Sequence, residues 1–207
     1  MNIPLRYFIY QRRYLPTMHE TELSLIAQSY FSEVEVMTIY NISIVPDFQL
    51  ILEFDRYIGG IGLFNVNKGR TGRYHVEDRD IFRPLQYIYM NLETRHSNLS
   101  WYTRDIIHMC GLHLEAIIKR FTGKYKYPLG KNLFDKKLTK TIDQKLLMEL
   151  NVIAKLFNAA KHDVSHYKDE HLFSIADAIY CYFLTRKLAS QLYPFIMLNT
   201  TSEVWKE

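Results

Sequence analysis

Apolar side chains recur every three or four residues in the second half of the chain, which predicts amphipathic helices. One such stripe runs from Ser100 to Phe121, and Gly123 follows it as a natural C-terminal stop. At 100° per residue, a second set of side chains gathers on the opposite face of the same helix. That polar set comprises Arg104, His108, Gly111, Glu115 and Lys119.

Two further apolar stripes complete the pattern. A Thr-x-x-Gln capping box at Thr141 predicts a helix start, and the stripe behind it continues to Ala160. The last stripe begins near Asp169 and must end before Pro194. Because short connections between helices favour antiparallel neighbours, we expect a mainly α protein with an antiparallel helical bundle over residues 100–207.

Weaker patterns in residues 1–99 predict an N-terminal helical extension. A capping box at Thr17 begins one helix, and Pro46 suits the first turn of another that Gly59 ends. Residues 34–45 alternate in a β-branched run, so a strand and a continued helix both stay open there. The extension has room for a few short strands. It is also expected to contain a loop over residues 59–80 and a helix from about Pro84 to Arg95.

Composition agrees with a helical protein inside the cell. The chain holds 8 glycines and 6 prolines among 207 residues, and few chain-breakers favour long helices. No stretch approaches the roughly 20 apolar residues of a membrane span, and the N-terminus lacks the pattern of a signal peptide. Cys110 and Cys181 are far apart within apolar patterns, so we expect reduced core thiols. These features predict a cytoplasmic protein that does not enter a membrane.

Positive charge is concentrated in residues 119–145. This segment carries nine basic and two acidic residues, a net charge of +7, whereas the whole chain carries +4. Aromatic residues are interleaved with the basic ones, as in proteins that track a phosphate backbone and stack bases. A solvated lysine-rich connection between two helices is the alternative interpretation. The candidate nucleic-acid-binding residues are Lys119, Arg120, Lys124, Lys126, Lys131, Lys136 and Lys137.

The motifs of several enzyme classes are absent. The chain has no complete GxGxxG motif, no GxxxxGK[ST] loop and no Ser or Cys nucleophile elbow. His162 and His166 are spaced like the two ligands of the HExxH zinc helix, with His171 or Asp177 as a third ligand. However, Asp163 is one methylene shorter than the usual general-base Glu. A polar helix end is therefore the favoured interpretation, and neither a metal nor another cofactor is expected.

Residues 150–163 resemble the late helix of HEPN-superfamily proteins, all-helical domains of toxin–antitoxin, abortive-infection and RNA-processing systems. The match is Asn158-x-x-Lys161-His162-Asp163 near a helix end, before a short loop and a closing apolar helix. The earlier polar helix that carries Arg104 and His108 resembles the first helix of the same bundle. The resemblance covers residues 100–193 and implies a HEPN-like bundle over residues 100–207, preceded by a separate extension over residues 1–99.

The resemblance implies ribonuclease chemistry without a metal. Such cleavage needs a base near the ribose 2′-hydroxyl and a cation near the phosphorane, and this family commonly supplies both with Arg-x4–6-His across a dimer cleft. Here lysine replaces arginine, as Lys155-x6-His162 and Lys161-x4-His166, and lysine lacks the bidentate fork. The implied roles are His162 as base, Lys155 or Lys161 as phosphate clamp and Asn158 as orienting amide, with Arg104, His108 and Asp163 in support.

Three functions follow from these patterns. The first is an RNA-directed HEPN-like protein, a metal-independent endoribonuclease of toxin or phage-defence type that acts as a homodimer. The second is a non-catalytic HEPN-like adaptor or nucleic-acid- or nucleotide-binding module, which the missing arginine favours. The third is a metal-dependent hydrolase built on His162 and His166. The resemblance also implies an antitoxin or nucleotidyltransferase partner, and the sequence leaves open both an enzyme and a binding module.

Overall fold

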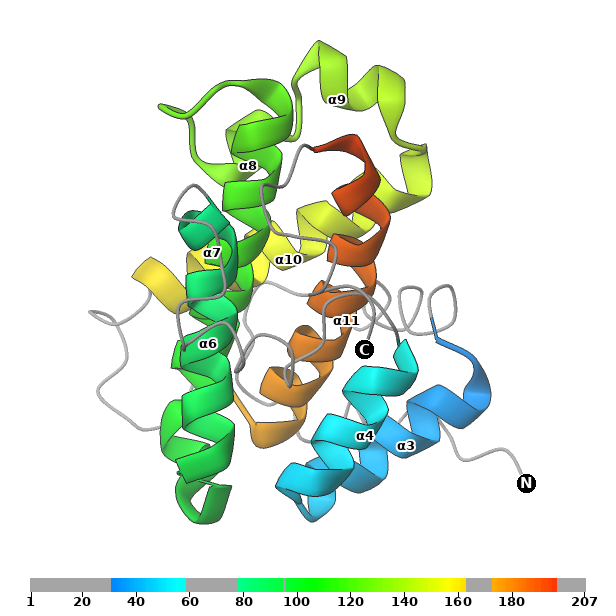
Figure 1. The fold of residues 1–207 in the computed structure, drawn as a ribbon, viewed down its shortest axis with the longest axis vertical. Helices are drawn as coiled ribbons and strands as arrows, with labels where there is room; N and C mark the ends of the chain where they lie inside the picture. Colours follow the sequence, from blue (N-terminus) through cyan, green and yellow to red (C-terminus); the bar gives the residue numbers. More distant parts are fainter. Residues whose placement is uncertain (1–30, 59–77, 95, 163–172, 197–207) are drawn as a thin grey trace.

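The described part of the chain is helical, as expected from the apolar stripes (Figure 1). The computed structural model describes residues 31–58, 78–94, 96–162 and 173–196, and no strand occurs within those ranges. The prediction of a mainly α protein built as a helical bundle is therefore confirmed. In chain order the elements are α3 (Glu33–Ile44), α4 (Phe48–Ile58), α6 (Arg79–Thr94), η3 (His96–Tyr102), α7 (Thr103–Thr122), α8 (Leu129–Asn132), α9 (Lys136–Thr141), α10 (Gln144–His162), α11 (Ile175–Leu192) and η4 (Tyr193–Phe195).

The segment left open between helix and strand is the helix α3. Ser32 precedes it as the N-cap, and its hydroxyl accepts a hydrogen bond from the Glu35 amide at 3.3 Å. The Glu35 carboxylate in turn accepts from the Ser32 amide at 2.7 Å, which completes a capping box. The capping box gives a hydrogen-bond partner to two backbone amides that a helix start would otherwise leave without one. It therefore favours a helix here over the strand that the β-branched alternation also allowed. The helix expected from Thr17 lies outside the described residues, as does most of the expected loop over 59–80.

α7 is the central helix of the molecule. It packs against α6, α10 and α11, and Figure 1 shows α6 and α7 side by side in opposite directions while α10 crosses them. Its predicted end at Gly123 is confirmed, because this residue forms the C-cap with φ 72° and donates its amide to the Lys119 carbonyl. Glycine adopts this left-handed backbone without the steric cost that a Cβ would bring. The predicted apolar face is buried, with Ile106, Cys110 and Leu114 fully excluded from solvent.

α6 begins earlier than the sequence suggested. We expected a start near Pro84, but the helix starts at Arg79 and contains that proline. Arg120 on α7 explains the earlier start, because its guanidinium donates to Asp78 at 2.5 Å and to Asp80 at 2.8 Å. These bonds hold the first turn in place, although Pro84 in the second turn has no amide to donate to the carbonyl of Asp80. A contact across about 40 residues could not be predicted from local sequence patterns.

The last two long helices begin later in the chain than the expected starts at Thr141 and near Asp169. The capping box predicted at Thr141 is wrong, because this hydroxyl donates to the Lys137 carbonyl at 2.8 Å. Asp143 takes its place, since the carboxylate accepts from the Leu146 amide at 2.7 Å. α11 begins after Ser174, whose hydroxyl caps the helix, and ends before Pro194 as predicted.

The buried side chains form one core from Phe31 to Tyr193, and it includes residues of α3, α4 and α6 as well as α7, α10 and α11. A buried ion pair reinforces it: Asp55 on α4 accepts from Arg186 Nε at 2.9 Å and from the Tyr182 hydroxyl at 2.5 Å. Cys110 and Cys181 are both fully buried in this core, as expected for free core thiols. Within the described ranges, no helix is both long and apolar enough to cross a membrane.

Candidate RNA-binding site at the α7–α10 crossing

The polar face predicted on α7 packs against α10 at Gly111, and its four polar side chains are half-buried rather than fully exposed to solvent. Phe157 is 2% exposed and packs directly on Gly111, where a Cβ would overlap the phenylalanine ring. Only a glycine admits such a close approach of two helices at this point. The crossing therefore brings the polar residues that flank Gly111 next to the end of α10.

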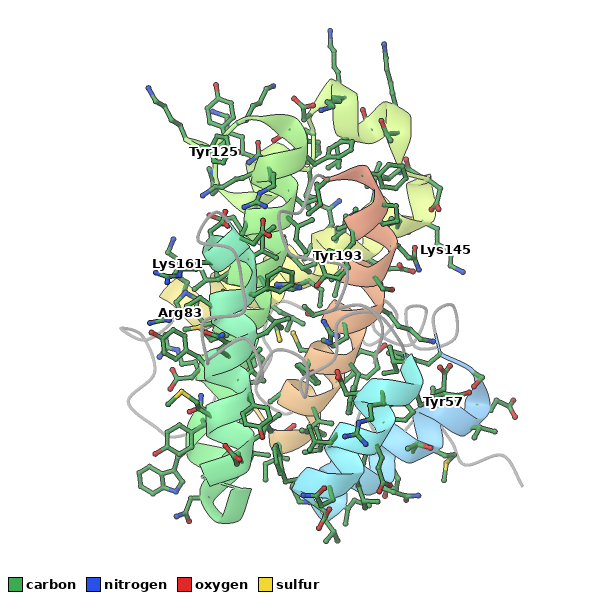
Figure 2. All side chains as sticks on the ribbon, in the orientation of Figure 1. Tyr57, Arg83, Tyr125, Lys145, Lys161 and Tyr193 are labelled. Atoms are coloured by element: carbon green, nitrogen blue, oxygen red, sulfur yellow. The ribbon has the colours of Figure 1, made fainter. Side chains whose placement is uncertain are left out.

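His108 and Lys161 meet around the Phe157 ring. The imidazole of His108 stacks on this ring with centroids 5.4 Å apart and an interplanar angle of 21°. Lys161, one turn further along α10, places its Nζ 5.9 Å from the centroid of the same ring. The side chain of Lys161 reaches the edge of the molecule in Figure 2, whereas Lys145 at the start of α10 lies on the opposite flank. An imidazole and an ammonium group thus share one aromatic support.

Arg104 completes the group from one turn before His108. Its Nε donates to the carbonyl of Ala160 at 2.6 Å, which is one of the last carbonyls of α10. This bond ties the two helices together and satisfies a carbonyl that the helix end leaves without an amide partner. We call Arg104, His108 and Lys161 the crossing cluster.

The surroundings of His108 favour its neutral form. Partial burial is the largest cause and lowers the pKa of His108 below its usual value, and the positive charges of Lys161 and Arg104 lower it further. Asp105 and Glu115 act in the opposite direction without reversing the shift. His108 is therefore a neutral imidazole at pH 7.

The other residues assigned by the resemblance lie on the outer side of α10. Lys155 and Asn158 are exposed, and we call them the outer stripe. His162 is the last residue of the helix, so its backbone continues the same stripe at 100° per residue. Asp163, His166 and His171 lie outside the described residues. The structure therefore brings Lys161 together with Arg104 and His108, whereas Lys155 and Asn158 face solvent on the outer side of α10.

Many of the cations in the basic segment are already paired. Lys119 contacts Glu115 at 2.5 Å, and Lys124 contacts Asp135 at 2.5 Å. Lys137 donates to the Phe121 carbonyl at 2.6 Å and lies 4.8 Å from the centre of that ring. With Arg120 bound to two aspartates, four of the seven candidate nucleic-acid-binding residues also hold the local fold.

The other three candidates are exposed to solvent. Lys126 and Lys136 are exposed, and Lys131 is exposed with its Nζ 4.2 Å from the Tyr127 ring centre. Exposed aromatic side chains accompany them, since Tyr125 is 61% and Phe134 is 78% exposed. Figure 2 shows Tyr125 at the far end of the molecule, above α7. This α8–α9 surface has the cations and rings that base stacking uses.

The described residues give the metal hypothesis no ligand group. No cluster of three or more His, Cys, Asp or Glu residues that could hold a metal ion occurs among them. Asp177, a candidate third ligand, has a structural role, because its carboxylate accepts from the Ser174 amide at 2.9 Å and from the Ser174 hydroxyl at 2.8 Å.

Phe157 belongs to the apolar stripe that ends at Ala160, so the sequence predicted it to lie in the core but not to support the site. The signal that could have revealed this support is the glycine at position 111, which interrupts an otherwise polar helix face. No family model, curated protein or solved structure matches this chain. The assignment of a function therefore depends on the chemistry of these side chains.

Proposed function

We propose that this chain is an RNA-directed, HEPN-like helical protein that binds RNA over the α7–α10 crossing. The observation that carries the proposal is the crossing cluster, in which two cations and an imidazole gather on one edge of the fold. Within the described residues, neither the terminal nitrogens of Arg104 nor Lys161 Nζ has a carboxylate partner. The paired cations of the basic segment differ in this respect. An unpaired cation can bind a phosphate without first breaking an existing ion pair.

Two further surfaces support the proposal. The outer stripe adds an exposed ammonium group and an exposed amide on the solvent side of α10. The α8–α9 surface adds exposed lysines and aromatic rings, which bind a flexible single strand better than a rigid duplex because every base offers a ring face. A single-stranded RNA is therefore the proposed ligand, with its backbone on the crossing cluster.

The test is RNA binding measured at several salt concentrations. Fluorescence anisotropy with a labelled single-stranded RNA is expected to show an affinity that falls with salt, because bound phosphates release counterions. The double variant Arg104→Gln/Lys161→Gln should reduce the slope of log K against log[salt] by about 1.4, since each lost contact to a single strand contributes about 0.7.

Lys145→Gln is the matched control for Lys161→Gln. It removes the same charge from the same helix but on the opposite flank of the molecule (Figure 2), so the affinity should change much less. An RNA affinity that does not depend on salt, or a double variant that binds as wild type does, would contradict the proposal.

A metal-independent endoribonuclease of toxin or phage-defence type is the second candidate. It is favoured by the outer stripe, because Lys155 and Asn158 share an exposed helix face with the backbone position of His162. This function predicts a homodimer in which two stripes face one groove, which light scattering would detect. His162→Ala should then abolish cleavage of tRNA and mRNA in the presence of EDTA, and equal cleavage by the variant would reject this assignment.

A further inference from the structure

We infer that Arg104 and Lys161 hold one phosphodiester of RNA beside His108, and that His108 removes the proton from the neighbouring ribose 2′-hydroxyl. The inference rests on the proposed RNA-binding function and adds a catalytic residue to it. It assigns the base to α7, whereas the sequence pattern pointed to His162 at the end of α10.

Arg104 is oriented by its neighbour and keeps its forked end available. Its Nε is occupied by the Ala160 carbonyl at 2.6 Å, which fixes the plane of the guanidinium group. Its two terminal nitrogens have no hydrogen-bond acceptor in the described part of the chain. A guanidinium that is fixed in this way presents parallel donors to a phosphate, and less rotamer entropy is lost when the phosphate binds.

Lys161 supplies the second charge from the other helix. Its ammonium group lies at the Phe157 ring, which also supports the His108 imidazole. Cation–π contact at an exposed site is weak, so the ammonium group can turn toward a phosphate at little cost. Two cations on adjacent helices can therefore share one phosphodiester.

His108 has the properties of a general base. Stacking on Phe157 holds the ring, and neither ring nitrogen takes part in a hydrogen bond in the described ranges. Partial burial and the charges of Lys161 and Arg104 lower the pKa of His108, whereas Asp105 and Glu115 raise it. The lowering prevails, so the imidazole is neutral at pH 7. A base must be unprotonated before it can accept a proton, so this environment suits the role.

The step conserves atoms and charge. The 2′-oxygen attacks the neighbouring phosphorus while His108 takes its proton, and Arg104 and Lys161 offset the charge that develops on the phosphorane. The bond from phosphorus to the 5′-oxygen then breaks, and that oxygen takes a proton from a solvent water. His108 returns its proton to the solvent. The products are a 2′,3′-cyclic phosphate and a 5′-hydroxyl, and no metal, oxidant or second substrate is consumed.

Two variants of His108 separate chemistry from folding. His108→Phe keeps a ring for the Phe157 stack, and His108→Gln keeps a polar group of similar length. Both are compared with wild type and with His162→Gln, in EDTA, for RNA affinity by anisotropy and for cleavage of a 5′-labelled RNA. We expect both His108 variants to keep the wild-type affinity within about twofold and to lose at least about 100-fold in cleavage rate, as removal of a general base does.

The possible results distinguish the inference from the proposed function. Wild-type cleavage by His108→Phe, or RNA binding by the wild type without any cleavage, would overturn the inference and leave the binding function standing. Absence of RNA binding by the wild type would overturn both.

A measurement on the unmodified protein decides the case if the variants fail to fold. Addition of a non-cleavable 2′-fluoro RNA should shift the imidazole NMR signal of His108, and an unshifted signal would overturn the inference. The cleavage rate of the wild type should also rise with pH and level off below the usual histidine pKa. A plateau reached only above that value would contradict the base role of His108.

Discussion

Replacement of Gly111 by alanine tests the geometry on which the site depends. An added Cβ at this position would overlap the Cβ and ring atoms of Phe157, not the far end of a flexible chain. Phe157 is 2% exposed within the core, so its ring has no space into which it can turn. The variant must therefore shift α10 away from α7 or distort the rotamer of Phe157.

The expected cost follows from two opposing effects. Overpacking of a close-packed core costs about 1–3 kcal/mol, and the overlap with backbone-proximal atoms places this substitution at the upper end. Alanine favours a helix interior over glycine by about 1 kcal/mol, which offsets part of the loss. The net destabilisation should be about 2 kcal/mol, and the melting temperature should fall by about 4–8 °C for a domain of this size.

Urea unfolding followed by circular dichroism measures this change. Gly130→Ala is the matched control, because Gly130 lies in the helix α8 and a Cβ there would meet nothing within 4 Å. The control should be neutral or stabilising by a few tenths of a kcal/mol through its effect on the unfolded chain. If Gly111→Ala were as stable as Gly130→Ala, α7 and α10 would not approach as closely as described. The placement of Arg104, His108 and Lys161 in one cluster would then be contradicted.

Two other groups give measurable predictions. His113 is fully buried and donates Nδ1–H to the Ile81 carbonyl at 2.7 Å, and burial lowers its pKa to about 3. Between about pH 3 and about pH 6.5, the unfolded chain binds a proton on this imidazole more readily than the folded chain does. The free energy of unfolding should therefore fall with decreasing pH, by up to about 1.4 kcal/mol per pH unit. Urea titrations of His113→Gln should show a shallower slope, and an equal slope would contradict the assignment. Asp55→Ala should cost about 3–5 kcal/mol, because it leaves Arg186 charged and buried without a carboxylate. A loss below about 1 kcal/mol in the same assay would show that solvent reaches the pair.

The helices were predictable wherever local chemistry decides their ends. The helix ends at Gly123 and before Pro194 were predicted correctly. A glycine in the left-handed conformation and a proline without an amide each end a helix within one turn of their own position. The start of α6 was not predictable, since Arg120 holds it from a helix about 40 residues away. The start of α10 was misplaced by two residues because Thr141 and Asp143 are both good caps, and the Lys137 carbonyl takes the threonine hydroxyl.

The candidate site was only partly predictable. The resemblance placed Lys161 in one site with Arg104 and His108 in support, but the sequence did not indicate which of these side chains lie together. Helical periodicity gives the direction of a side chain and not the identity of the helix it meets. The pairing depends on Gly111 and Phe157, which touch across 46 positions of sequence. The roles of His162, Lys155 and Asn158 stay predictions, as do the homodimer and the protein partner.

The buried bond between Asp55 and Arg186 has a consequence for attempts to divide the chain. Asp55 belongs to the first 99 residues and Arg186 to the remainder, and both side chains are 1% exposed. A fragment that begins at residue 100 would retain the guanidinium in an apolar interior with no counter-charge. Such a fragment would also lose the partners of Arg120 at Asp78 and Asp80. Expression of the C-terminal half alone is therefore expected to yield aggregated protein, and co-expression of residues 1–99 as a separate chain should restore solubility.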